Sequence, residues 1–485
     1  METLNKKLHP KPARKIKILQ FGEGNFLRGF SDWIIQKMNE SISFEAGVVV
    51  VQPLETGRVD DLAEQDGLYT LYTEGIENGE AVKKKEIIDV LDDFINPYAD
   101  YKKFLSYARS RDLETVISNT TETGIALDAT DTDFSACPKS FPGKLLAFLY
   151  ERYVYFKGDI TKGLNVIPCE LIDDNAKELK RILAELARVK GFGAGFIKWL
   201  TESNRYVSTL VDRIVPGFPR DETAALNEEN GYIDSCAVKA EVFHLWVLEG
   251  DPRVKQAFPA DKCGLNVVYA PDIKPYKERK VRILNGSHTA LVPIAYLSGY
   301  DAVRDGIGDK FIGEFLSGLI FKEINPTIKL PADELNVFAD SVLERFQNPF
   351  IRHELMSIAL NSTAKFRARL VPTLCDHIKI KGKAPRRLLF ALAAFILFHK
   401  GKRGGQTIAL NDDPGLLEKW RAAWGKYGAD TGALVKEILS WAGVWGTDIN
   451  ALGKGITKSV SGYLDDMIAD GMLKSVEKFL KKARK

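Results

Sequence analysis

The chain has 485 residues, of which 45% are hydrophobic and 27% are charged, and its formal net charge is +3. This length is sufficient for two or three domains with large cores. The near-neutral charge argues against a nucleic-acid-binding protein, which usually carries a concentrated basic face. The longest apolar run, Leu388 to Phe398, is too short to span a bilayer and predicts a buried helix.

Cysteine and histidine usage gives expectations about compartment and metals. The five cysteines are far apart, no Cys-x-x-Cys pair occurs, and the six histidines are scattered. We therefore expect no disulfide framework, no metal site and a reducing, cytoplasmic compartment. Met1 to Lys15 is basic and polar without an apolar core, which differs from a secretory signal.

The first fifty residues predict a βαβ unit. Ile16 to Phe21 is β-rich and leads into Gly22-Glu23-Gly24-Asn25-Phe26, after which apolar residues recur at helical spacing up to Met38. Val48 to Val51 predicts a strand that is buried on both faces, as in a parallel sheet. A glycine turn between a strand and a helix suits a pyrophosphate. Because Leu27 replaces the third glycine of Gly-x-Gly-x-x-Gly, a simple strand-to-helix turn is the alternative.

Two strand ends offer further polar groups. An acid at the end of the second strand would hold the ribose of NAD, but Gln52 stands there, and no Lys or Arg follows it immediately. NAD and NADP are therefore poorly separated, with a preference for NAD. The strand Glu114 to Ser118 ends in the hydroxyl-rich loop Asn119 to Gly124, which predicts either a ligand site or an ordinary turn.

A fourth strand, Leu164 to Ile167, precedes several polar residues. Cys169 is expected to be buried as a small apolar residue. Asn175, just before the predicted helix Lys177 to Arg188, is either a helix N-cap or an oxyanion-type donor. Asp212 and Arg213 lie inside an apolar strand, and we expect a structural ion pair or polar network there.

Strand patterns end near Asp272, and helical patterns dominate from Asp301 onward. We therefore predict two domains, residues 1–274 and 275–485: an α/β domain of the Rossmann type and a mostly α-helical domain. The predicted helices of the second half are Asp309–Lys322, Ala332–Phe346, Arg352–Leu370, Arg386–His399, Gly415–Trp424, Gly432–Trp441 and Val460–Leu480.

The segment Lys277 to His288 places Lys280, Asn285 and His288 within nine residues. An amine, an amide and an imidazole are the side chains that carbonyl reduction needs without a metal; a charged helix start is the alternative. In one straight α-helix Lys280 and His288 would lie ~12 Å apart along the axis. The long side chain of Lys280 would then have to extend toward His288 for both to act on one substrate.

Cations stand near these residues and further along the chain. Lys277, Arg279 and Arg282 are candidates for lowering the pKa of Lys280. Lys365 and Arg369 lie four apart on a predicted helix, where they can bind a carboxylate or form a solvated basic face.

Three motifs together resemble the mannitol dehydrogenase family, the polyol-specific long-chain dehydrogenases. They are Gly-x-Gly-x-Phe-x-Arg from Gly22 to Arg28, Val-Asp-Arg from Val211 to Arg213, and Lys-x4-Asn-x2-His from Lys280 to His288. The resemblance covers nearly the whole chain in order. The segments Gln20–Arg28, Ser118–Glu122, Pro168–Asp173 and Asp272–Val281 are most similar to the keto-uronate-reducing members, which use NAD(H) in bacterial hexuronate breakdown.

The resemblance implies roles for individual residues. Lys280 is the expected acid/base, Asn285 and Asn175 the oxyanion-type donors, and His288 the residue that orients substrate oxygens. The chain departs from the family pattern at two places: Glu170-Leu171 replaces the Asp-Asn pair of the mannitol members, and Lys277 stands where polyol-oxidising members often have an acid for proton exit.

The resulting expectation is an NAD-dependent oxidoreductase with a fold like that of 6-phosphogluconate dehydrogenase. Its substrate would be a small keto-uronate held by Lys365 and Arg369, without nucleic acid, membrane or metal, and the chain would be a monomer or small homo-oligomer. The expected cofactor contacts are Phe21, Gly22, Glu23, Gly24, Asn25, Phe26, Leu27, Arg28, Gln52, Asn119 and Thr120. Another keto-uronate reductase, a polyol or polyol-phosphate dehydrogenase, and a silent dinucleotide-binding redox sensor are the alternatives.

Overall fold

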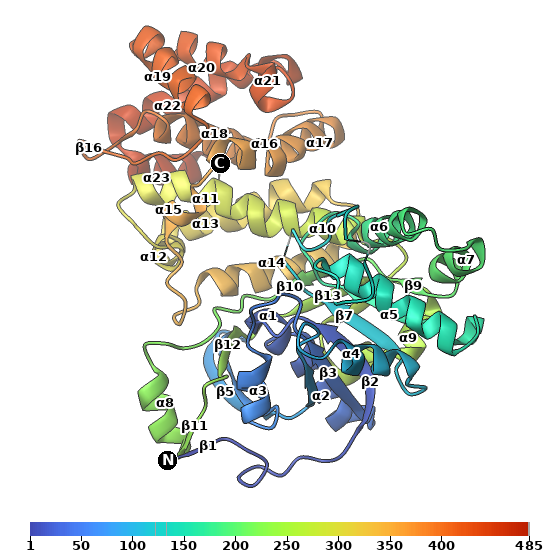
Figure 1. Ribbon diagram of the computed structural model, residues 1–485. Coiled ribbons are helices and arrows are strands. Elements are labelled where there is room, and N and C mark those ends of the chain that lie inside the picture. The colour runs from blue at the N-terminus through green and yellow to red at the C-terminus, as the bar shows by residue number, and fades with distance from the viewer. Residues whose placement is uncertain (122, 132, 484–485) are drawn as a thin grey trace. The chain divides into compact units, whose positions relative to one another are not determined.

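The computed structural model describes residues 1–121, 123–131 and 133–483. The chain divides into two compact units (Figure 1). Unit 1 comprises Met1–Glu74 and Val82–Ile273; unit 2 comprises the hairpin tip Gly75–Ala81 and the chain from Lys274 onward. Unit 1 is α/β and unit 2 is helical, which confirms the predicted fold class.

Unit 1 is built on a six-stranded parallel sheet. Its strands, in spatial order, are β6 (Leu91–Ile95), β3 (Ala46–Val51), β2 (Lys15–Phe21), β7 (Thr115–Ser118), β8 (Asn165–Pro168) and β9 (Arg205–Tyr206). This is the doubly wound order in which the first strand lies between the second and the fourth. Such sheets bind ligands outside the carboxyl ends of the strands where the order reverses, here between β2 and β7.

Both faces of this sheet are buried, as the run of valines predicted. Val48 and Val50 belong to one core, together with helix α2 (Ser31–Ile42). Val49 and Val51 belong to the other core, which contains apolar residues of α5 (Phe141–Tyr155) and α6 (Asn175–Val189). Alternate side chains of one strand thus pack against helices on opposite faces of the sheet.

Smaller sheets and helices complete unit 1. The strands are β1 (Glu2–Thr3) with β11 (Tyr232–Ile233); β10 (Thr209–Asp212) with β13 (Leu245–Glu249) and β14 (Val267–Ala270); and β12 (Val238–Glu241) with β4 (Tyr69–Glu77) and β5 (Glu80–Ile88). The other helices are α1 (Asn25–Arg28), α3 (Val59–Glu64), α4 (Tyr101–Ser106), α7 (Ala194–Glu202), α8 (Thr223–Asn230) and α9 (Pro252–Ala257).

The predicted continuous helix from Phe26 to Met38 is wrong, because it breaks between α1 and α2 at Gly29 and Phe30. The buried guanidinium of Arg213 explains the break: its Nη1 donates to the carbonyl of Gly29 at 2.7 Å. Its other groups donate to the carbonyl of Glu241 and the hydroxyl of Thr73. Arg213 is therefore part of a polar network, which is one of the two structural roles expected for it.

Unit 2 is built from helices around α18, which packs against α11 and α22. The helices are α10 (Lys274–Arg279), α11 (Gly286–Leu297), α12 (Val303–Gly308), α13 (Lys310–Leu319), α14 (Ala332–Phe346), α15 (Leu355–Ile358), α16 (Ser362–Arg369), α17 (Val371–Lys381), α18 (Arg386–Phe398), α19 (Pro414–Tyr427), α20 (Thr431–Leu439), α21 (Ala442–Trp445), α22 (Ile456–Asp470) and α23 (Met472–Ala483). A short hairpin, β15 (Lys402–Arg403) and β16 (Gln406–Thr407), follows α18.

Two helix predictions in unit 2 are wrong because the backbone turns left-handed inside them. The segment Arg352–Leu370 divides into α15 and α16 where Asn361 has φ of 51°. The segment Val460–Leu480 divides into α22 and α23 at Gly471, where φ is 80°. Asparagine and glycine are the residues that tolerate this conformation. By contrast, α14 has the predicted bounds.

Two π-helical segments interrupt the α-helices of unit 2, at Lys280–Asn285 and Ile320–Ile324. The first joins α10 to α11 without a break. In the described part of the chain, no helix combines the length and apolar character needed to cross a bilayer.

Candidate functional site

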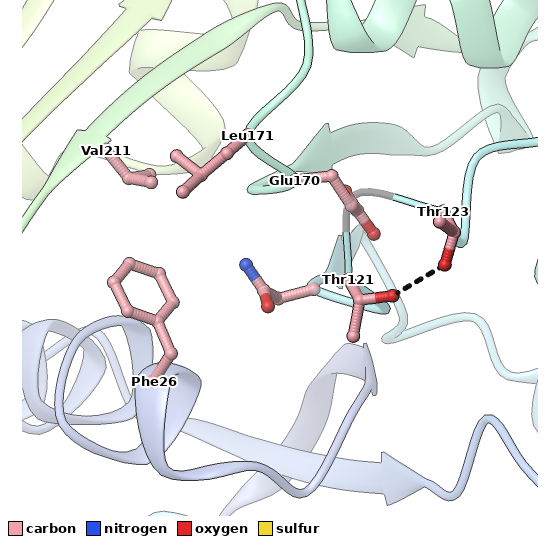
Figure 2. Close-up of a pocket in the computed structure, with 7 residues that line it drawn as sticks. Phe26, Thr121, Thr123, Glu170, Leu171 and Val211 are labelled. Atoms are coloured by element: carbon pink, nitrogen blue, oxygen red, sulfur yellow. Dashed lines mark hydrogen bonds between the residues drawn. The ribbon is translucent and has the colours of Figure 1, made fainter. Parts of the chain in front are cut away.

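Unit 1 contains a cavity of about 520 Å³ at the carboxyl ends of β2, β7 and β8. Its lining residues are Phe26, Asn119, Thr121, Thr123, Glu170, Leu171 and Val211. Figure 2 shows an apolar side made by Phe26, Leu171 and Val211, opposite a polar side with Thr121, Thr123 and Glu170. The cavity thus offers an apolar surface for a ring and polar groups for its substituents.

The glycine turn lies between β2 and α1 and is held by the sheet. Gly22 donates its N–H to the carbonyl of Val51 at 3.1 Å. Its φ is +119°, and a Cβ built there would lie 2.9 Å from the carbonyl oxygen of Asn119. The turn therefore requires glycine at this position. A Cβ built on Gly24 meets no heavy atom within 4 Å, so the backbone there is open to the approach of a ligand.

Arg28 fixes the shape of this turn from within the protein. Its side chain is 5% exposed and donates to the carbonyl of Cys236, the carbonyl of Glu23 at 3.1 Å and the Oδ1 of Asn25 at 2.7 Å. Its guanidinium also stacks over Tyr69. Of the expected cofactor contacts, Arg28 thus shapes the turn, and Asn25 serves as one of its acceptors.

Beneath the turn lies a buried polar cluster that sequence reasoning missed. Gln20 donates to the carbonyl of Gly22 at 3.1 Å and lies 3.4 Å from the carboxyl of Asp32. Ser31 and the hydroxyl of Tyr69 also approach that carboxyl. Complete burial raises the pKa of Asp32 to about 7, against which these hydrogen bonds act.

Gln52 is 3% exposed and folds back into its own loop. Its Nε2 donates to the carbonyls of Leu54 and Glu55 at 2.9 and 3.1 Å. The amide therefore organises the loop after β3, and neither donor remains for a ribose in this conformation.

Glu170 joins the ends of β7 and β8 at the cavity. Its carboxylate accepts from the N–H and hydroxyl of Thr120, both at 3.0 Å, and from the hydroxyl of Ser118 at 3.1 Å. Asn119 adds a second link by donating to the carbonyl of Cys169 at 2.9 Å. Burial raises the pKa of Glu170, and these donors oppose the rise. Glu122, in the motif Ser118–Glu122, lies outside the described residues.

Asn175 is buried at the first position of α6 rather than at its N-cap, which is Asp174. Its Nδ2 lies 3.0 Å from the carbonyl of Pro168, 3.1 Å from that of Glu170 and 3.3 Å from the hydroxyl of Thr209. Its Oδ1 accepts two backbone N–H groups. An oxyanion role for Asn175 therefore requires that one of these bonds be exchanged for the substrate oxygen.

In unit 2 the π-helical turn changes the geometry of the Lys-Asn-His segment. Residues five apart in an α-helix are rotated by about 140° around the axis, because each residue turns by about 100°. In a π-helix, the i→i+5 hydrogen bond closes one turn. Lys280 and Asn285 bound this π-helix and therefore lie one turn apart on the same side. His288 follows Asn285 by three residues in an α-helix, so it lies on the same side of the helix.

The polar groups of Asn285 and His288 are available for a ligand. The side-chain amide of Asn285 has no hydrogen bond within the described part of the chain. His288 Nε2 is buried and has no partner among the described residues. The ring stacks on Phe346, with centroids 4.1 Å apart, and meets His353 edge-on at 5.1 Å. Burial and the nearby His353, Arg345 and Arg369 hold the pKa of His288 well below its usual value.

The arginines beside Lys280 are engaged elsewhere. Arg279 is buried and forms an ion pair with Glu334 at 2.7 Å. Arg282 is buried between Glu278 and Asp376, with 2.6 Å to each carboxylate. Each arginine is therefore paired with carboxylates of unit 2.

Arg369, by contrast, reaches the Lys-Asn-His segment. Its Nη1 donates to the hydroxyl of Thr289 at 3.2 Å and lies 3.4 Å from the carbonyl of Asn285. Lys365 donates to the carbonyl of Ile358 at 2.9 Å. Burial lowers the pKa of both groups, and the charge of Arg369 contributes to the shift at Lys365. The two cations therefore influence each other, and Arg369 lies beside Asn285.

The sequence predicted Phe26 as a cofactor contact and the loop Asn119 to Gly124 as either a ligand site or a turn, and Asn119, Thr121 and Thr123 of that loop line the cavity. It did not predict Glu170, Leu171 and Val211 as lining, because only the sheet order brings the loops after β7 and β8 together. Among the described residues, no three His, Cys, Asp or Glu side chains gather in a way that could hold a metal ion.

Comparison with known proteins relates both units to one family. Residues 16–262 match the mannitol dehydrogenase Rossmann domain, and residues 272–467 match the mannitol dehydrogenase C-terminal domain. The chain belongs to the mannitol dehydrogenase family. Both halves of the predicted resemblance are thereby confirmed, and the Lys-Asn-His segment lies in the C-terminal domain of the family.

Within the mannitol dehydrogenase family, the chain is similar over its full length to curated altronate oxidoreductases. It is 46% identical to that of Yersinia enterocolitica, over 98% of this chain and 99% of the relative. It is 43% identical to that of Bacteroides thetaiotaomicron, over 99% and 100%. A solved D-sorbitol dehydrogenase shares the fold, with a TM-score of 0.81 and 22% identity over 98% of this chain and 100% of that one.

Proposed function

We propose that the protein is an altronate oxidoreductase, which interconverts D-altronate and D-tagaturonate with NAD(H). The observation that carries this proposal is the π-helical turn Lys280–Asn285, which places an amine and an amide on one side beside the cation Arg369. The full-length similarity to altronate oxidoreductases supports the choice of substrate.

The proposed cofactor fits unit 1. The turn at Gly22 to Phe26 leaves open backbone at Gly24, and the cavity beyond it has one apolar and one polar side. The expected pyrophosphate position is this turn, and the nicotinamide position is the cavity. When bound, NADH supplies the hydride that reduces the ketone. We assign NAD rather than NADP because no Lys or Arg directly follows β3.

The residues of unit 2 act on the substrate carbonyl. Lys280 protonates the carbonyl oxygen during reduction and takes the proton back during oxidation. The Asn285 amide donates a hydrogen bond to the same oxygen, on which negative charge develops, and so stabilises the transition state more than the ground state. Neutral His288 can offer Nε2 to a neighbouring substrate hydroxyl.

Lys365 and Arg369 are the proposed anchors for the uronate carboxylate. An arginine can bind a carboxylate through two parallel hydrogen bonds. Because Arg369 already contacts the carbonyl of Asn285, a carboxylate held there is tied to the turn that carries the catalytic amide. A neutral polyol has no carboxylate that Lys365 and Arg369 could bind.

The proposed location is the cytoplasm, and the substrate is a free sugar acid. All five cysteines are free thiols, which suits a reducing compartment.

Replacement of the acid/base tests the proposed chemistry. With D-altronate and NAD⁺, wild-type protein should produce NADH, and Lys280→Ala should lower kcat by roughly 10²–10⁴-fold, the usual contribution of a general acid/base. Lys379→Ala, which removes an exposed lysine of α17, is the matched control and should change kcat by less than threefold. Turnover of Lys280→Ala within tenfold of wild type would remove Lys280 from the mechanism.

A further inference from the structure

The cavity of unit 1 contains a buried carboxylate. Of the seven lining residues drawn in Figure 2, Glu170 alone is ionisable, and it is 2% exposed. The other polar lining groups are the amide of Asn119 and the hydroxyls of Thr121 and Thr123. Among the described lining residues, a ligand in this cavity therefore meets one acidic group, and the other lining groups are neutral.

The hydrogen bonds of Glu170 favour its ionised form. One oxygen accepts both the N–H and the hydroxyl of Thr120, and the other accepts the hydroxyl of Ser118. A backbone N–H can only donate a hydrogen bond, so it stabilises an ionised carboxylate more than a protonated carboxylic acid. In the described part of the chain, no Lys, Arg or His forms an ion pair with Glu170. Its charge is thus held by neutral donors and is not cancelled locally.

The position of the cavity identifies which part of a dinucleotide this charge would meet. A doubly wound sheet consists of two mononucleotide-binding halves. Glu170 lies at the ends of β7 and β8, the fourth and fifth strands of the sheet, and therefore in the second half, beyond the glycine turn. Under the proposed function, on which this inference rests, that half receives the nicotinamide.

We propose that Glu170 makes the cavity bind the oxidised nicotinamide in preference to the reduced one. The nicotinamide ring carries a positive charge in NAD⁺ and none in NADH, while the rest of the two molecules is identical. A carboxylate within about 10 Å, at an effective dielectric constant of about 20, favours the cationic ring on the order of tenfold. Glu170 thus acts electrostatically, and it sets the ratio of the affinities for NAD⁺ and NADH.

Binding measurements on the full chain test this role without reference to turnover. Dissociation constants for NAD⁺ and NADH are measured by titration calorimetry on wild type and on Glu170→Gln. Glutamine keeps an acceptor for Thr120 and can donate to the hydroxyl of Ser118, so the loop keeps its hydrogen bonds. The expected result is that NAD⁺ binds about tenfold more weakly, while NADH changes by less than twofold.

Ser118→Ala is the matched control, because it removes one hydrogen bond from Glu170 but leaves the charge. It should leave the ratio of the two dissociation constants unchanged. Equal weakening of NAD⁺ and NADH in Glu170→Gln, or the same change of ratio in Ser118→Ala, would overturn the proposal and assign Glu170 a purely structural role.

A second variant covers the case in which Glu170→Gln does not fold. Thr123→Lys adds a cation at an exposed position of the cavity lining, without touching the hydrogen bonds of Glu170. The dissociation constant for NAD⁺ should again rise relative to that for NADH. An unchanged ratio of the two constants contradicts the proposal. If wild type binds neither NAD⁺ nor NADH, the proposed function itself fails, which is a distinguishable result.

Discussion

Arg369, one of the two proposed carboxylate anchors, lies beside the π-helical turn, since its guanidinium contacts Thr289 Oγ1 and the carbonyl oxygen of Asn285. The amides of Asn285 and Asn175 differ sharply. The Asn285 side chain is unused within the described residues, whereas Asn175 already bonds the ends of β8 and β10 together. Of the two proposed oxyanion donors, Asn285 is therefore the one prepared for substrate.

Removal of the anchor should affect substrate binding selectively. We expect Arg369→Ala and Lys365→Ala each to raise KM for D-tagaturonate about ten- to hundredfold, the effect of losing a hydrogen bond between charged groups. KM for NADH should change by less than twofold. Steady-state kinetics with each substrate varied in turn measures both effects.

Arg367→Ala is the matched control, because Arg367 lies on the same helix, is exposed and contacts the carbonyl of Gly443 instead. Its KM values should equal those of wild type. An unchanged KM for D-tagaturonate in both Arg369→Ala and Lys365→Ala would dismiss this patch as the carboxylate site.

Residue types and spacing predicted Lys280, Asn285 and His288 as a group, because those side chains suit the chemistry and occur close together. The role of Glu170 could not be predicted in the same way. The donors around Glu170 come from Ser118 and Thr120, about fifty residues earlier, and meet it through the pairing of β7 with β8. Such a contact depends on sheet order and leaves no local pattern.

At the scale of elements, the π-helical turn changes the rotation between Lys280 and Asn285, so that both lie on the same side of the helix. A shift of the backbone hydrogen bonds by one residue has no compositional signature, so the sequence predicted a helix here but not its register. The breaks at Asn361 and Gly471 were missed for a related reason: an isolated Asn or Gly also occurs inside intact helices.

The glycine turn offers an element-scale prediction. Gly22→Ala places a Cβ at positive φ and 2.9 Å from a backbone oxygen, which should destabilise unit 1 by roughly 1–3 kcal/mol. Chemical denaturation followed by tryptophan fluorescence measures this loss.

Gly24→Ala provides the comparison for Gly22→Ala. Gly24 has φ of −68° and open space around its Cβ position, so its substitution should alter the free energy of unfolding by less than about 0.5 kcal/mol. Equal losses in the two variants would contradict the strained role of Gly22.

At the scale of the molecule, the alternation of strands and helices up to Asp272 and the helical patterns afterwards predicted the fold class. The six-stranded order of the parallel sheet then explains why the polar loops after β7 and β8, about fifty residues apart, share one cavity. Family membership and fold leave the substrate open, because a D-sorbitol dehydrogenase has the same fold. The substrate assignment depends on the cations of unit 2 and on the full-length relatives.

The most direct measurement is NADH oxidation by the purified chain with D-tagaturonate, D-fructuronate, D-fructose and D-fructose 6-phosphate in parallel. The proposed function predicts that kcat/KM is highest for D-tagaturonate, and that the neutral ketose D-fructose, which lacks a carboxylate, is reduced at least 10²-fold less efficiently. A higher kcat/KM for any of the other three substrates, or no NADH oxidation with any of them, would contradict it.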